Sequence, residues 1–152
     1  MKIKKIKKQD LGQLLNIWKE AFPVHNIFNK SDEEIKKYLR KSKGKVIAAY
    51  EDSGVVGGCL LVVYVQTPEH ALARIKHLAV AKEHRGKDIG TALLKKCEKI
   101  AGKGKIEMHV AKSISGEDIL EFYKKNGYEV EGELKSHYRP NEICYIVGKV
   151  VG

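Results

Sequence analysis

Cysteine is scarce in this chain of 152 residues: only Cys59, Cys97 and Cys144 occur, and they lie far apart. An odd number of widely spaced cysteines, each within an apolar stretch, fits neither a disulfide framework nor the paired ligands of a zinc motif. We expect all three to be small buried side chains in a reducing compartment. The sequence therefore predicts no structural disulfide and no metal site.

Long apolar segments are also absent. No stretch approaches the roughly 18 apolar residues that cross a membrane as a helix. The basic segment 1–6 has neither the apolar centre nor the cleavage site of a signal peptide. We accordingly expect a cytoplasmic protein without a membrane partner, present as a monomer or a homodimer.

Acidic residues are outnumbered: 29 lysines and arginines face 19 aspartates and glutamates, which gives a formal net charge of +10. Such an excess is common among nucleic-acid-binding proteins. The lysines are spread along the whole chain, however, without an arginine-rich block or an aromatic–basic signature, so nucleic-acid binding is the weakest alternative. The net charge attracts anionic ligands and disfavours polycationic ones at long range.

The length and the hydrophobic share of 43% are sufficient for one domain with its own core, and we predict a single domain over residues 1–152. Alternating and helical apolar patterns predict a mixed α/β fold. Asp10 is expected to cap a first helix, and Ser31 with Glu34 forms a capping box before a second. Gly57 and Gly58 indicate a bulge in a long strand. The predicted strands lie near residues 3–6, 45–51, 55–65, 74–80, 106–111, 128–132 and 143–150, with two further helices over 89–101 and 117–126.

The stretch from 74 to 101 combines a strand, a short polar loop and a helix. The loop reads Arg85-Gly86-Lys87-Asp88-Ile89-Gly90, which is basic and contains two glycines. The first N–H groups of a helix have no partner within the helix, and glycine lets an anion approach the backbone closely. This arrangement predicts a phosphate site, unless the glycines serve only the geometry of the turn.

The same stretch resembles the acetyl-CoA-binding motif of the GNAT N-acetyltransferases, whose pattern is Arg/Gln-x-x-Gly-x-Gly/Ala after a strand. Arg85 matches the first position and Gly90 the last, whereas Asp88 replaces the middle glycine. The flanking residues 78–80 and 91–94 also fit, and the likeness covers most of the chain in order. The resemblance implies acetyl-CoA as the cosubstrate. Its implied contacts are Leu78, Ala79, Val80, Arg85, Gly86, Lys87, Asp88, Ile89, Gly90, Thr91, Tyr123 and Asn126.

The resemblance also implies a fold and an activity. The fold is a twisted, mostly antiparallel sheet of about six to seven strands flanked by about four helices, splayed between the fourth and fifth strands. The gap would admit the pantetheine arm, which pairs with the backbone of Leu78 and Val80. The implied activity is transfer of the acetyl group to a primary amine by direct attack in a ternary complex, without a metal.

Asp88 departs from the motif in a way that bears on affinity. Aspartate tolerates left-handed backbone better than most residues, and it is a good N-cap, so it can accept from the N–H of Gly90 or Thr91. These are N–H groups that a pyrophosphate would need, and the carboxylate would also repel phosphate. We predict that Asp88 weakens CoA binding, partly offset by Arg85 and Lys87.

The segment Phe122-Tyr123-Lys124-Lys125-Asn126-Gly127-Tyr128 resembles a second family segment, Leu-Tyr-Glu-Lys-x-Gly-Phe. The tyrosine of that segment commonly acts as the general acid for the CoA thiolate, which implies this role for Tyr123; the alternative is a half-buried structural tyrosine. An asparagine that usually precedes this tyrosine is replaced by Gly116, which removes one CoA contact.

The general base has no clear family counterpart, since the glutamate found in many members is missing. His77 and His109 lie in the fourth and fifth predicted strands. A histidine with a pKa near 6.5 can accept a proton directly or through water. Both histidines are candidates, and for each the alternative is a purely structural role.

Two further residues are candidate contacts for the acceptor. Phe28 lies in an apolar loop over residues 23–30 that either lines a substrate cleft or, as we slightly favour, plugs the core. Tyr138 lies in a tail similar to the hairpin of protein N-terminal acetyltransferases, which favours peptide amines weakly over small amines. The main alternative function is a catalytically weak acyl-CoA-binding module, for which Asp88, Gly116 and the missing glutamate would be signs of decay.

Overall fold

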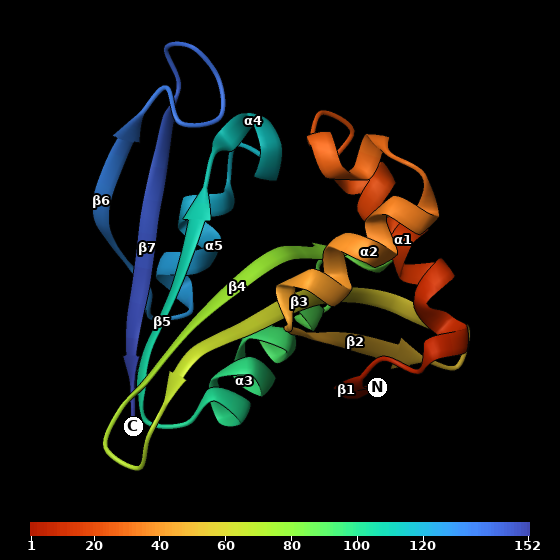
Figure 1. Cartoon of the computed structure of the whole chain (residues 1–152), viewed down its shortest axis with the longest axis horizontal. Helices are drawn as coiled ribbons and strands as arrows, with labels where there is room; N and C mark the ends of the chain where they lie inside the picture. Colours follow the sequence, from red (N-terminus) through yellow and green to blue (C-terminus); the bar gives the residue numbers. More distant parts are fainter. The chain divides into compact units, whose positions relative to one another are not determined.

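The computed structural model describes all residues from 1 to 152 and contains seven strands. They hydrogen-bond in the order β1-β2-β3-β4-β5-β7-β6 (Figure 1). The β4–β5 pair is parallel, whereas the β1–β2, β2–β3, β5–β7 and β6–β7 pairs are antiparallel. The predicted mixed α/β fold with a mostly antiparallel sheet is therefore confirmed. The elements are β1 (Lys2–Lys5), η1 (Lys8–Asp10), α1 (Leu11–Ala21), η2 (Asn26–Asn29), α2 (Asp32–Ser42), β2 (Lys45–Glu51), β3 (Gly54–Gln66), β4 (Ala71–Val80), η3 (Lys82–His84), α3 (Ile89–Ala101), β5 (Gly104–Val110), α4 (Lys112–Ser115), α5 (Ile119–Lys125), β6 (Glu129–Lys135) and β7 (Ile143–Val151).

The chain divides into two compact units. The first contains residues 1–62 and 75–100, and the second contains residues 63–74 and 101–152. Strands β3 and β4 each run through both units. None of the helices combines the length and the apolar character that crossing a membrane requires. The single domain over 1–152 stays a prediction.

In the first unit, α1 and α3 cover opposite faces of β3. A Cβ on Gly58 would lie 2.8 Å from the Leu14 side chain of α1. The neighbouring Cys59 Sγ lies 3.5 Å from Cys97 Sγ of α3. Successive side chains of a strand point to opposite faces, so the two helices lie on opposite sides. This accounts for the continuous burial of residues 55–62, as expected for a strand that is covered on both faces.

The start of β3 carries the predicted bulge. Ala49 of β2 pairs with Gly57, but Tyr50 pairs with Val55, so Val56 is the extra residue. A Cβ on Gly57 would lie 2.9 Å from the carbonyl oxygen of Ala79, which shows how closely β3 and β4 approach there. The two glycines thus serve strand packing beside the bulge.

The two predicted helix caps have different outcomes. Ser31 Oγ accepts a hydrogen bond from the Glu34 N–H at 3.2 Å, which confirms the cap of α2. The prediction for Asp10 was wrong, because its carboxylate makes no hydrogen bond to the start of α1. Instead it accepts from the Tyr50 hydroxyl at 2.9 Å. A partner distant in sequence has replaced the local one.

The second unit is built around β5 and the β6–β7 hairpin, which joins to β5 through β7 (Figure 1). Helix α5 ends at Lys125, Gly127 follows in the left-handed conformation (φ 88°), and the Tyr128 N–H donates to the Tyr123 carbonyl at 3.0 Å. This is the predicted left-handed helix ending. It turns Tyr128 back into the core, where only 2% of the residue is exposed.

The parallel pairing of β4 with β5 is short. It covers Ala71–Arg74 on β4 and Gly104–Glu107 on β5, although both strands continue beyond these residues. A Cβ on Gly104 would collide with the backbone of Ala71, so only glycine permits the close approach at the start of the pair. The predicted separation of the fourth and fifth strands is confirmed.

Candidate functional site

The loop between β4 and α3 lies entirely in the first unit. After Val80 the chain forms η3 and reaches Arg85, whose Nε donates to the Val80 carbonyl at 3.1 Å. Gly86 follows in the left-handed region (φ 79°) and a Cβ there would meet nothing within 4 Å. The conformation, and not crowding, therefore favours glycine at this position.

Asp88 also adopts the left-handed conformation (φ 60°), as its position in place of a motif glycine requires. Its carbonyl accepts from the Ala92 N–H at 3.0 Å and so begins α3. The predicted cap is absent: the carboxylate accepts from neither Gly90 nor Thr91. A capping side chain needs extended backbone at its own residue, which the left-handed turn does not provide.

A row of backbone N–H groups is consequently left without an acceptor in the chain. It comprises the amides of Gly86, Lys87, Asp88, Ile89, Gly90 and Thr91. The three amides of the first turn of α3 carry the positive end of a helix of 13 residues. Arg85 and Lys87 are exposed beside them. Donors, dipole and side-chain charge together form a site that suits an anion such as phosphate.

The end of β4 leads directly into this loop. The residues of β4 that pair with β5 are Ala71–Arg74, and Leu78 and Val80 follow them in the first unit. Leu78 and Val80 are partly exposed there, whereas Ala79 is buried against the core. An extended chain with amide groups can add to a strand edge by backbone hydrogen bonds.

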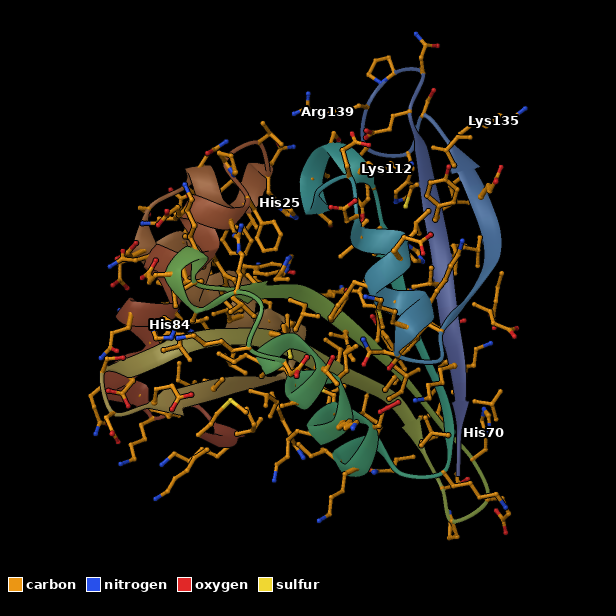
Figure 2. All side chains as sticks on the ribbon, turned by 180° about the vertical axis from the view of Figure 1, so that it is seen from behind. His25, His70, His84, Lys112, Lys135 and Arg139 are labelled. Carbon is orange, nitrogen blue, oxygen red and sulfur yellow. The ribbon has the colours of Figure 1, made fainter.

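His77 interrupts β4 with left-handed backbone (φ 58°), which is costly for a residue other than glycine. Tyr38 Oη lies 2.7 Å from His77 Nε2. The ring also contacts Phe28 edge-on with centroids 4.9 Å apart, and His25, labelled in Figure 2, at 5.1 Å. These contacts from α2 and the α1–α2 connection hold the strained residue in place.

The surroundings of His77 argue against its predicted role as a general base. Burial, together with the positive charges of His25 and Lys76, lowers the pKa of His77 to about 3. The imidazole is therefore neutral at physiological pH, and it is a very weak base for an ammonium group. Its contacts favour a structural role, while the catalytic role stays a prediction.

Phe28 packs inside the same cluster. Only 3% of the residue is exposed, and its ring lies 5.3 Å from Trp18 and 5.8 Å from Phe22 between centroids. These contacts correspond to the core plug that the sequence slightly favoured. Contact of Phe28 with an acceptor stays a prediction.

In the second unit, Tyr123 is 4% exposed, with its ring 5.8 Å from that of Tyr128. Asn126 uses its side-chain amide to donate to the Phe122 carbonyl at 2.8 Å, and its own carbonyl accepts from Lys149 Nζ at 3.0 Å. Asn126 thus closes the end of α5. Its predicted contact with CoA, and the acid role of Tyr123, are not tested by these contacts.

The remaining predicted residues lie around the β6–β7 connection. Tyr138 is 46% exposed and its ring lies 4.6 Å from that of His137. His109 on β5 is half-buried, with its ring 5.8 Å from His137. The structure thus brings His109 and Tyr138 close to one shared neighbour. All three cysteines are buried, as predicted.

The comparisons with known proteins decide the family. A family model described as an acetyltransferase (GNAT) domain matches residues 42–130, which is more than half of the chain. The chain belongs to the GNAT acetyltransferase family. A search of curated protein sequences finds no significant match.

Solved structures share the GNAT fold at low sequence identity. Arabidopsis thaliana Naa50 in complex with the bisubstrate analogue CoA-Ac-MVNAL has a TM-score of 0.73 and 24% identity, with 97% of each chain covered. An aminoglycoside 6'-N-acetyltransferase complexed with coenzyme A has a TM-score of 0.77 and 19% identity over 99% of this chain and 97% of that one. Ribosomal-protein-alanine N-acetyltransferase from Brucella melitensis has a TM-score of 0.74 and 17% identity, with 99% of this chain and 100% of that chain covered.

The sequence alone did not point to several residues of this GNAT chain. Tyr38, His25 and Trp18 surround His77, and His137 with Cys144 lies beside His109. His137 and Cys144 lie in the tail that supplied Tyr138, but that resemblance assigned a role to neither of them, and Tyr38, His25 and Trp18 belong to no motif. They come together only through packing between elements, and a histidine in each group was the sole sequence signal.

We predict that His77 makes the free energy of unfolding rise with pH between about 3 and 6.5. The pKa is about 3 in the folded chain and about 6.5 when unfolded, so the unfolded state binds the proton first as pH falls. The contribution of His77 to the free energy of unfolding is complete above pH 6.5 and is lost as the pH falls from about 6.5 to about 3. The slope is at most about 1.4 kcal/mol per pH unit. Urea unfolding at several pH values measures it.

His77→Asn keeps a residue that tolerates left-handed backbone but cannot titrate, so it should flatten the pH slope. His70→Gln is the matched control, since His70 is exposed between β3 and β4 (Figure 2) and should leave the slope unchanged. A wild-type slope in His77→Asn would show that His77 is not the buried neutral group described here.

Proposed function

We propose that this chain is an N-acetyltransferase that moves the acetyl group of acetyl-CoA to a primary amine by direct attack in a ternary complex. The observation that carries the proposal is the row of acceptorless N–H groups over residues 86–91, in a chain that belongs to the GNAT family. Structural neighbours with coenzyme A or a CoA-containing analogue support the choice of cosubstrate.

The pyrophosphate of acetyl-CoA would accept from the N–H groups of the loop, with Arg85 and Lys87 supplying charge. The pantetheine arm carries amide groups, which would pair with the backbone of Leu78 and Val80 on β4. The strand contact and the loop contact are close in sequence, because only Ala81 and η3 lie between Val80 and Arg85.

The reaction forms one bond and breaks one. The amine nitrogen attacks the thioester carbon, the C–S bond breaks, and the CoA thiolate takes up a proton. We propose Tyr123 as the donor of that proton. The amine must first lose its own proton, which at pH 7 costs roughly 4–5 kcal/mol for a lysine-like amine of pKa about 10.4 but only about 1 kcal/mol for an α-amine of pKa about 8.

An α-amine therefore needs only a weak base, and this suits a chain without the family glutamate. His109 is the better histidine candidate, since His77 is deeply packed and very weakly basic. It would act directly or through a water molecule. The net charge of +10 also disfavours polycationic acceptors, so a peptide N-terminus is our first choice ahead of an aminoglycoside.

One observation keeps an acyl-CoA-binding module as the second candidate. The Asp88 carboxylate stands at the loop that would receive the pyrophosphate, where it opposes negative charge. A protein that binds acetyl-CoA weakly and turns over no amine would fit that reading.

Substitution of Asp88 tests the loop. We expect both Asp88→Gly and Asp88→Asn to tighten acetyl-CoA binding by roughly threefold to tenfold, because each removes a negative charge from the phosphate site. Asn keeps the size and the left-handed tolerance of Asp, so it separates charge from backbone freedom. Calorimetric titration gives the affinities. Equal or weaker binding by both variants would disprove the inhibitory role of the carboxylate.

A panel of acceptors tests the activity. With peptides, aminoglycosides and small amines supplied in turn, release of the free CoA thiol should be fastest with peptide N-termini. Tyr123→Phe should lower kcat by about tenfold or more while leaving the affinity for acetyl-CoA nearly unchanged. Tyr128→Phe is the matched control, as a buried tyrosine next to Tyr123. Binding without release from any amine would favour the non-catalytic module.

A further inference from the structure

The second unit brings two imidazoles and one thiol together outside the loop described above. His109 lies on β5, His137 follows β6, and Cys144 lies on β7. Their ligand atoms, one from each side chain, all lie within 4.8 Å of one another. The acetyl transfer proposed above requires no such group of three.

The register of the sheet explains the convergence. His109 pairs with Ile146 across the β5–β7 ladder, and Cys144 lies two residues before Ile146. Residues two apart on a strand share a face, so Cys144 is a diagonal neighbour of His109 on the same side of the sheet. The sheet itself therefore fixes two of the three side chains.

The third side chain is placed by the β6–β7 connection. Leu134 pairs with Cys144, and the chain then turns at Ser136, which has left-handed backbone (φ 53°). The Ser136 N–H donates to the Glu142 carbonyl at 2.8 Å, and Ser136 Oγ accepts from the Asn141 N–H at 3.0 Å. His137 therefore begins a loop whose two ends are joined by the hydrogen bonds of Ser136, and this places the His137 side chain near Cys144.

The donor set suits a borderline-soft divalent cation. Imidazole nitrogen and thiolate sulfur are preferred ligands of Zn²⁺, and three protein ligands with one open position are common in zinc sites. Zinc–ligand bonds of about 2.0–2.3 Å place tetrahedral ligands about 3.5 Å apart, so the group must contract by roughly 1 Å. His137 is exposed and lies in a loop, so it can supply this movement.

Glu142, two residues before Cys144, is a further candidate ligand. Glu142 itself does not complete the group, because its two carboxylate oxygens accept from the Ser113 N–H at 3.2 Å and the Ser113 hydroxyl at 2.6 Å.

We propose that His109, His137 and Cys144 form a zinc-binding site with a fourth position open to water. On binding, the S–Zn bond forms and the thiol proton passes to solvent, while both imidazoles bind through a neutral nitrogen. The ion would enter from the exposed His137 side and join β5, β7 and the β6–β7 loop. The site shares His109 with the proposed acetyl transfer, in which His109 is the candidate base, but zinc binding is measured without acetyl-CoA or an acceptor, so the two proposals can fail separately.

Metal titration of the full, reduced chain tests the site. After treatment with a chelator, Zn²⁺ added in a calorimeter should bind at one ion per chain with micromolar or tighter affinity, whereas Mg²⁺, which prefers oxygen ligands, should not bind. Co²⁺ serves as a spectroscopic probe, because a bound thiolate gives a charge-transfer band in the near ultraviolet. No stoichiometric Zn²⁺ binding at about 100 micromolar would overturn the proposal.

Two variants test proposed ligands, and a third serves as the control. His137→Gln changes an exposed loop residue and should weaken Zn²⁺ binding by about tenfold or more, and Cys144→Ser should remove the cobalt charge-transfer band. His70→Gln, at an exposed histidine of the same unit, should change neither result (Figure 2). The site would be refuted if His137→Gln bound Zn²⁺ as tightly as the wild type, or if His70→Gln weakened Zn²⁺ binding as much as His137→Gln does. A wild-type cobalt complex without the thiolate band would also refute it.

Discussion

The proposed chemistry depends on backbone N–H groups that find no acceptor within the chain. Two left-handed residues, Gly86 and Asp88, turn the chain from η3 into α3 and leave the amides of residues 86–91 without partners. In water such groups are solvated, so they cost little; with a bound phosphate they become charge-assisted donors. The loop is short and its geometry is set locally, which makes the anion site a property of a few consecutive residues.

Strand β4 connects that loop to a strained position. His77 holds left-handed backbone within the strand, two residues before the buried Ala79. Its hydrogen bond with Tyr38 and its ring contacts with His25 and Phe28 stabilise this conformation. The aromatic cluster of α1, η2 and α2 therefore shapes the strand edge that would carry the pantetheine arm. These contacts favour a positional contribution of His77, and its low pKa of about 3 makes it a weak base.

Local chemistry was predictable from the sequence, whereas partners distant in sequence were not. The loop over residues 85–90 was found because glycine, charge and the start of a helix occur together, and the left-handed Asp88 followed from its place in the motif. The cap at Asp10 failed because Tyr50, 40 residues away, takes its carboxylate. The environment of His77 and the grouping of His109 with His137 and Cys144 arise from packing and strand register, which no local pattern encodes.

The most direct test of the central claim is to follow the backbone amide resonances of isotopically labelled protein during titration with acetyl-CoA. The account predicts the largest shifts at the amides of residues 86–91, with smaller changes at Leu78 and Val80. Acetyl-pantetheine, which has no phosphate, should perturb the β4 residues but not the loop. Binding of acetyl-CoA that leaves the amides of residues 86–91 unchanged would contradict the account.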